Sequence, residues 1–136
     1  MRDEIIEMRE KRVLMDRVGS FRDLKVYQRA YSNSLEIHKL SLNFPKHEQY
    51  ELAGQLRRAT KSVAMNIAEG FGKDGSLAEF KRFLLIAQGS CEEVRVHLDY
   101  CRDLGYIDKD VYTKYEDEYV IIAKMLWKMI QNWRKI

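Results

Sequence analysis

The fold of this chain is decided by the stretch Gln55–Gly72, which reads QLRRATKSVAMNIAEGFG. Its apolar residues recur every three or four positions, the spacing of one face of an α-helix. With the residues that precede it, the stretch predicts a helix from about Glu48 to Phe71. The expected inward row consists of Leu52, Leu56, Ala59, Val63, Ile67 and Phe71.

The two flanks of this helix are unusual for a surface that only faces water. At 100° per residue, one flank carries Arg57, Lys61, Ala64 and Ala68. The other flank carries Gln55, Arg58, Ser62, Asn66 and Glu69. Small residues allow a neighbouring helix to approach closely, so we expect a second packing surface beside the core row.

Length and composition indicate a single all-α domain. The chain has 136 residues, one proline (Pro45) and seven glycines, and is rich in helix-forming residues. Lysine and arginine exceed aspartate and glutamate by 24 to 21, a net charge of +3 that permits a polyanionic partner without requiring one. We expect an amphipathic N-terminal helical arm in residues 1–20 and a bundle domain in residues 21–136.

Three further helices are predicted by the same periodicity, over residues 21–43, 77–103 and 109–134, with turns around Pro45 and Gly105. The expected core row of the first is Leu24, Tyr27, Tyr31, Leu35, His38 and Leu42. That of the third is Phe80, Leu84, Ala87, Cys91, Val94, Leu98 and Cys101. That of the fourth is Tyr112, Tyr115, Tyr119, Ile122, Leu126, Met129 and Trp133. Short turns between four long helices predict an up-down-up-down four-helix bundle.

One segment matches a nucleotide-binding pattern but not its context. Residues 70–75 read GFGKDG, which fits G-x-G-x-x-G, yet a helix precedes them where the dinucleotide motif requires a strand. We interpret these glycines as a chain reversal at positive φ. Ser76 and Glu79 then form a capping box for the next helix.

No catalytic, metal or cofactor motif is present. The residues three before His38, His47 and His97 are all apolar, which excludes the Glu-x-x-His pairs of a carboxylate-bridged metal site. The sequence therefore predicts no enzyme, no metal and no cofactor. Cys91 and Cys101 are expected to be buried thiols in a reduced, cytoplasmic setting, and no apolar run is long enough to cross a membrane.

Several motifs carry a resemblance to a known family. They are FRDL at 21–24, FP at 44–45, QLRRA at 55–59, NIAEG at 66–70, EF at 79–80 and LGYI at 104–107. On these residues the chain, over about 21–134, resembles the four-helix-bundle proteins named after intervening sequences in bacterial 23S ribosomal RNA genes, also called the S23 family. Glu51 and the pair Ala64-Met65 depart from the residues that members often carry.

The resemblance implies a homo-oligomer, expected to be a ring of five. It also implies similarity to the accessory protein of diversity-generating retroelements, a basic pentameric barrel that binds nucleic acid and partners a reverse transcriptase. The molecular function of the family itself is poorly defined.

Two functions remain open from the sequence. The first is an oligomer that binds RNA or other nucleic acid, largely without sequence preference, through the basic residues Arg57, Arg58, Lys61, Lys73, Lys81 and Arg82. The second is a protein assembly scaffold, in which basic residues such as Arg58 tie helices or subunits together. The family-motif residues expected at interfaces are Gln55, Ser62, Asn66, Glu69 and Gly70.

Overall fold

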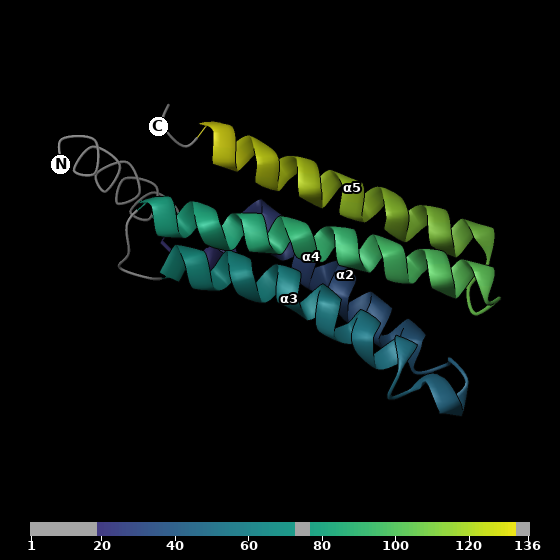
Figure 1. The fold of residues 1–136 in the computed structure, drawn as a ribbon. Coiled ribbons are helices and arrows are strands. Elements are labelled where there is room, and N and C mark those ends of the chain that lie inside the picture. The colour runs from purple at the N-terminus through teal and green to yellow at the C-terminus, as the bar shows by residue number, and fades with distance from the viewer. Residues whose placement is uncertain (1–18, 73–76, 133–136) are drawn as a thin grey trace.

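Four α-helices run up and down in sequence order, as predicted (Figure 1). The computed structural model describes residues 19–72 and 77–132. Its elements are the 3-10 helix η1 (Phe21–Asp23), α2 (Lys25–Ser41), the 3-10 helix η2 (Lys46–Glu48), α3 (Leu52–Gly72), α4 (Leu77–Asp103) and α5 (Lys109–Asn132). The predictions for the arm over residues 1–18, for Lys73, for Ser76 and for Trp133 lie outside the described residues.

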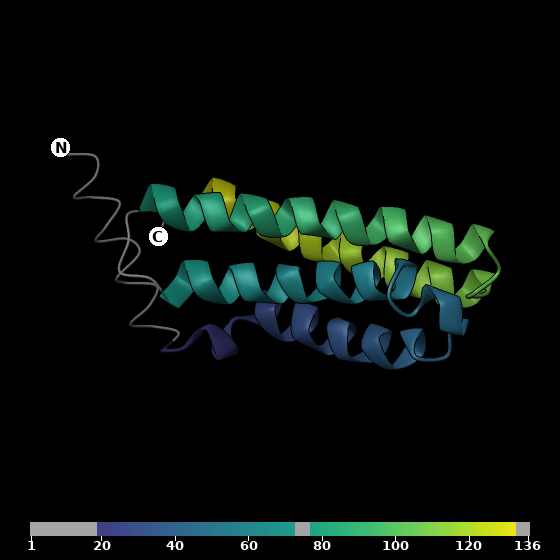
Figure 2. The same ribbon diagram turned by 60° about the horizontal axis from the view of Figure 1, so that its bottom comes forward.

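The helices enclose one core, with α3 and α4 in the closest contact. The seam between α2 and α5 is the least closely packed of the four neighbouring pairs. Helices α2 and α4 lie diagonally across the bundle and run in the same direction. Figure 2 shows α4 along one edge, α2 along the opposite edge and α3 between them.

Three of the four predicted core rows are confirmed. All six row residues of α3 and all seven of α4 are buried. In α5, Tyr115, Tyr119, Ile122 and Leu126 are buried, while Tyr112 and Met129 are partly buried against the core. The core therefore follows the heptad-like spacing read from the sequence.

The predicted core row of α2 is wrong. Of its six residues only Leu24, which caps the helix, is buried, while Tyr31 and Leu42 are 49% and 59% exposed. The face that packs into the bundle is instead Val26, Ala30, Asn33, Ser34, Ile37 and Ser41.

Local hydrogen bonds explain how α2 buries this partly polar face. The Ser34 and Ser41 hydroxyls donate to the carbonyls of Tyr31 and His38, at 2.8 and 2.7 Å. Asn33 donates to a carboxylate oxygen of Glu118 on α5 at 3.2 Å. Satisfied polar atoms cost little to bury, and small side chains let α2 approach its neighbours. The larger apolar row is consequently turned outward.

The predicted positive φ is wrong for Gly70 and Gly72, while Gly75 lies outside the described residues. Helix α3 continues through Gly70 to Gly72, and the positive-φ glycines of the described residues are Gly19 and Gly105. Gly70 is buried because α4 passes close to it: a Cβ at this position would lie 2.7 Å from the Cβ of Phe83. Gly105, at φ +80°, ends the turn after α4 as predicted.

The second helix begins later than predicted. The chain makes the short 3-10 helix η2 after Pro45, so α3 starts at Leu52 and not at Glu48. Its Gln49 side chain donates to the carbonyls of Ser41 and Phe44 at 3.0 and 2.9 Å. These hydrogen bonds fix the conformation of the loop between α2 and α3, which Pro45 alone does not determine.

We expect Gly70→Ala to lower the free energy of unfolding by about 1–3 kcal/mol, because the added methyl group overlaps Phe83 in a packed core. The matched control is Gly72→Ala, where nothing lies within 4 Å of the added Cβ. The control should change stability by no more than about 0.5–1 kcal/mol, in the stabilising direction. Urea unfolding measures both, and equal effects of the two variants would contradict the close approach.

The two cysteines are buried free thiols, as predicted. Burial raises the pKa of the Cys91 thiol to about 12, and does the same for Cys101. Since only the thiolate reacts, iodoacetamide at pH 8 should label the folded protein far more slowly than the urea-unfolded protein. Mass spectrometry measures the extent of labelling over time. Equal labelling rates for the native and the unfolded protein would contradict this burial.

Candidate nucleic-acid interface

Arg57 is committed to contacts inside the molecule. Its guanidinium donates to the Ser41 hydroxyl at 2.7 Å and to the Gln49 carbonyl at 2.6 Å. A further bond of 3.3 Å reaches the Gln49 side chain. Arg57 therefore fastens α3 to the end of α2 and to the loop between them, which makes it the weakest of the predicted phosphate contacts.

Arg58 and Lys61 are different, because both are exposed and no carboxylate in the described part of the chain pairs with them. Three other arginines do have acidic partners. Arg29 contacts Glu118 at 2.7 Å. The remaining two, Arg95 and Arg102, pair with Glu116 and Asp103 at 2.8 and 2.9 Å. Cations without an acidic neighbour are the ones available to an external anion.

Lys81 and Arg82 form a second basic group, at the start of α4. The Arg82 guanidinium lies over the Phe83 ring, 5.0 Å from its centroid, and its side chain is exposed. This group lies beside Gly70, because Gly70 packs closely against Phe83. Arg58 lies twelve positions before Gly70 on α3, which is about 18 Å along the helix. The structure thus divides the predicted basic cluster into two groups.

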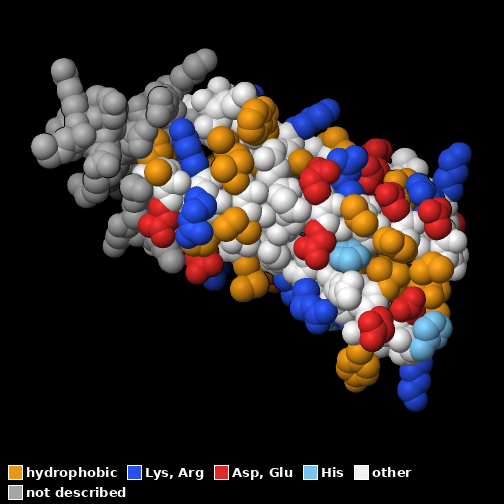
Figure 3. Space-filling model, in the orientation of Figure 1, with side chains coloured by type: hydrophobic (Ala, Val, Ile, Leu, Met, Phe, Trp, Pro, Cys, Tyr) orange, Lys and Arg blue, Asp and Glu red, His pale blue; other side chains and the backbone are white. Residues whose placement is uncertain are grey.

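Acidic side chains lie between the basic ones. On the face in Figure 3, lysine and arginine side chains alternate with aspartate and glutamate and do not merge into one basic field. On this face a single subunit therefore presents separate cations, not a continuous basic surface.

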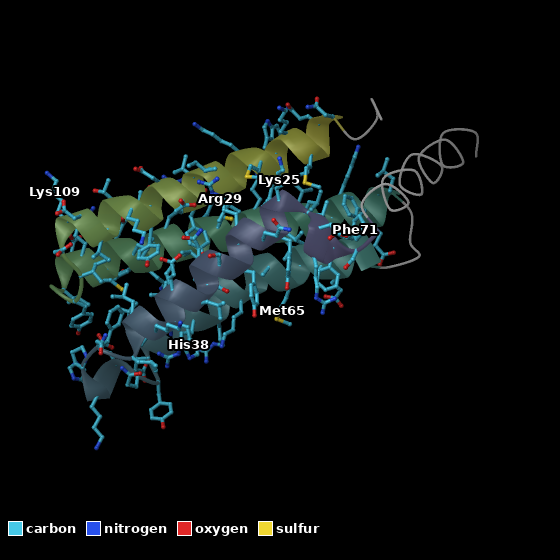
Figure 4. The ribbon with its side chains drawn as sticks, turned by 180° about the vertical axis from the view of Figure 1, so that it is seen from behind. Lys25, Arg29, His38, Met65, Phe71 and Lys109 are labelled. Carbon is cyan, nitrogen blue, oxygen red and sulfur yellow. The ribbon has the colours of Figure 1, made fainter. Side chains whose placement is uncertain are left out.

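His38 reports the local potential beside Arg57 and Lys61. The pKa of the His38 imidazole is lowered from its ordinary value, first by partial burial and then by the positive charges of Lys61 and Arg57. His38 and Met65 project from the same side of the bundle (Figure 4).

Two family-motif residues connect helices within one bundle. The hydroxyls of Ser62 on α3 and Ser90 on α4 are 2.9 Å apart. Asn66 donates to the Ser62 carbonyl at 2.8 Å and to its hydroxyl at 3.1 Å. With buried Gly70, these residues hold α3 against α4, while Gln55 and Glu69 are exposed.

An open groove of about 480 Å³ lies between α2 and α5. Its charged groups largely neutralise one another: Arg29 pairs with Glu118, and Lys114 pairs with Glu36 at 3.1 Å. Figure 4 shows Arg29 on the side of α2 that faces α5. Because the charges are already paired, the groove offers little to select an anion or a cation.

The described residues contain neither a metal-binding group nor a membrane-spanning helix. Residues 19–72 and 77–132 contain no group of three histidine, cysteine, aspartate or glutamate side chains placed to hold a metal ion. No helix in this part of the chain is long and apolar enough to span a bilayer.

The sequence interpretation missed an apolar face on α4 that points away from the core. Leu85, Ile86, Val96 and Tyr100 are all between 40% and 58% exposed. Their spacing, with Gly89 and Glu93 between them, alternates three and four residues from Ile86 to Tyr100. This second periodicity was readable in the sequence, but the stronger core row of the same helix obscured it.

The fold and its contacts define a small all-α protein of the four-helix-bundle class, without a recognisable reaction centre in the described residues. The family model of the 23S rRNA-intervening sequence protein matches residues 22–128, so the chain belongs to this family. One similar solved structure is a protein of unknown function from the S23 ribosomal protein family of Bacteroides thetaiotaomicron. It has 21% sequence identity and a TM-score of 0.72, over 78% of this chain and 95% of that one, and it supports the fold alone. No curated protein sequence matches the chain.

Measurements of the free energy of unfolding distinguish a structural role of Arg57 from a role in binding. We expect Arg57→Met to lower the free energy of unfolding by about 1–3 kcal/mol, because the Ser41 and Gln49 acceptors lose their donor. The neighbouring Arg58→Met removes the same charge from an exposed site and should change stability by less than about 0.5 kcal/mol. Thermal and urea unfolding compare the two, and equal losses would contradict the assignment.

Proposed function

We propose that this protein is a non-enzymatic homo-oligomer that binds RNA or another nucleic acid through phosphate contacts, largely without sequence preference. The residues proposed to make these contacts are Arg58, Lys61, Lys81 and Arg82, with Lys73 in the segment between α3 and α4. Arg57 contributes positive potential from its internal position.

The observation that carries this proposal is the unequal pairing of the cations. Arg29, Arg95 and Arg102 are held by carboxylates, whereas the α3 cations Arg58 and Lys61 have no such partner among the described residues. A phosphate can displace water from such side chains without breaking an existing ion pair. Contacts of this kind add affinity and salt dependence without reading the base sequence.

Oligomerisation strengthens the proposal, because two small basic groups on one subunit recur on every copy. A nucleic acid that spans several copies gains many weak contacts at once, as expected for multivalent binding. A ring of five, the assembly that family resemblance implies, would present ten such groups.

A protein assembly scaffold is the second candidate function. It is favoured by the number of large apolar side chains on the surface, among them Tyr31, Leu35, Val96 and Tyr100. Exposed apolar rows of this kind mark contact surfaces between proteins. This candidate differs from the first by needing no nucleic acid.

Nucleic-acid binding can be tested by fluorescence anisotropy with a labelled structured RNA at 50 and 200 mM salt. We expect measurable binding at the lower salt that weakens steeply at the higher salt. The double variant Arg58→Ala with Lys61→Ala should bind roughly tenfold more weakly and show a shallower salt dependence.

The matched control is Lys124→Ala with Lys128→Ala, which removes the same charge from exposed positions on α5. It should bind within about twofold of the unmodified protein if the α3 cations are the specific contacts. Equal weakening by both pairs would mean that total charge alone matters, and no binding at low salt would refute the nucleic-acid function.

A further inference from the structure

Helix α4 carries an exposed apolar row opposite its core row, here named the α4 outer seam. Its members are Leu85, Ile86, Gly89, Glu93, Val96 and Tyr100. The spacing from Ile86 to Tyr100 is that of a helix that packs against another helix. Val96, in its C-terminal half, is 52% exposed and has no neighbouring helix to cover it.

Helix α2 carries a second exposed row, the α2 outer seam, composed of Tyr31, Leu35, His38 and Leu42. Its side chains are larger than most of those on the face of α2 that the fold buries, which includes Asn33, Ser34 and Ser41. Leu35, near its centre, is 46% exposed. Each bundle therefore has two different helix faces suited to packing and not covered by the described residues.

The two seams lie on different sides of the bundle. Helices α2 and α4 occupy opposite corners (Figure 2), and the exposed residues of each seam lie off the helix face that packs into the core. A surface on one side of a subunit and a different surface on the other side suit a head-to-tail contact. The two helices also run in the same direction, as rotation about an axis parallel to the bundle requires of neighbouring copies.

The cross-helix contacts place the two seams at the same height. Ser41 on α2 bonds Arg57 on α3, and Ser62 on α3 meets Ser90 on α4. Because α3 is antiparallel to both neighbours, residue 36 of α2 is level with about residue 90 of α4 by this path.

The path through α5 gives a similar result. Glu36 on α2 pairs with Lys114 on α5, and Arg95 on α4 pairs with Glu116 on α5. By this path residue 36 is level with about residue 97 of α4. Both values lie within the α4 outer seam, so a rotation without translation brings the two seams of neighbouring copies together.

Charge also favours contact between unlike seams. Glu93 lies in the middle of the α4 outer seam, with its side chain 58% exposed. Lys39 is exposed beside the α2 outer seam. Two α4 seams would bring carboxylates together and two α2 seams would bring ammonium groups together, whereas unlike seams pair opposite charges.

We propose that the α2 outer seam of one copy packs in parallel against the α4 outer seam of the next, as a head-to-tail contact repeated around the ring of the proposed function. The occupant of each seam is a second copy of this chain. This inference rests on the homo-oligomeric part of the proposed function and assigns the surfaces that form it.

The test uses one blocking substitution on each seam, Leu35→Glu and Val96→Glu, and measures mass by light scattering without nucleic acid. In a head-to-tail ring every copy uses both seams, so each variant alone should be monomeric, at 16.2 kDa. A mixture of the two variants retains one intact pair of seams and should form a dimer of twice that mass. Circular dichroism confirms folding, since both positions are exposed.

Ile121→Glu is the control, because it places a charge on an exposed apolar residue of α5 outside both seams. It should keep the mass of the unmodified oligomer. Oligomers of unchanged mass with either blocking substitution would overturn the assigned surfaces while leaving oligomerisation intact. A monomeric unmodified protein would overturn the assembly itself; RNA binding is scored separately.

Discussion

The close packing of α3 against α4 is the constraint on which the rest of the structure depends. Gly70 removes the side chain that would meet Phe83, and the hydroxyls of Ser62 and Ser90 bond across the same interface. These small residues let two long helices lie side by side and align their core rows. Helix α2 then packs against α3 and helix α5 packs against α4, and α2 needs only small side chains to do so. The tight centre thus leaves the larger apolar residues of α2 on the surface.

This arrangement separates the residues that hold a subunit together from those available to partners. Arg57, Ser62 and Asn66 belong to the first kind, because each makes its hydrogen bonds inside one bundle. The exposed cations Arg58 and Lys61 and the two outer seams belong to the second kind. In the proposed function these surfaces act through repeated copies, since neither a separate cation nor one apolar row gives much affinity alone.

The sequence predicted most of the fold because three helices bury large apolar residues at regular spacing. It failed for α2, where Asn33, Ser34 and Ser41 are buried and their hydrogen bonds depend on neighbours that spacing does not reveal. The basic residues of α3 are visible in the sequence, but the hydrogen-bond partners of Arg57 depend on the shape of the loop at Gln49, which the sequence does not reveal. The separation of the basic residues into two groups likewise follows from three-dimensional packing.

The head-to-tail contact can be tested most directly by disulfide formation between two single-cysteine variants, Leu35→Cys and Gly89→Cys, mixed and oxidised. The native cysteines are buried and do not compete, and positions 35 and 89 belong to α2 and α4, which lie at opposite corners of one bundle. The account predicts cross-linked dimers that contain one copy of each variant. Dimers of Leu35→Cys with itself or of Gly89→Cys with itself, formed in preference to the mixed species, would contradict it.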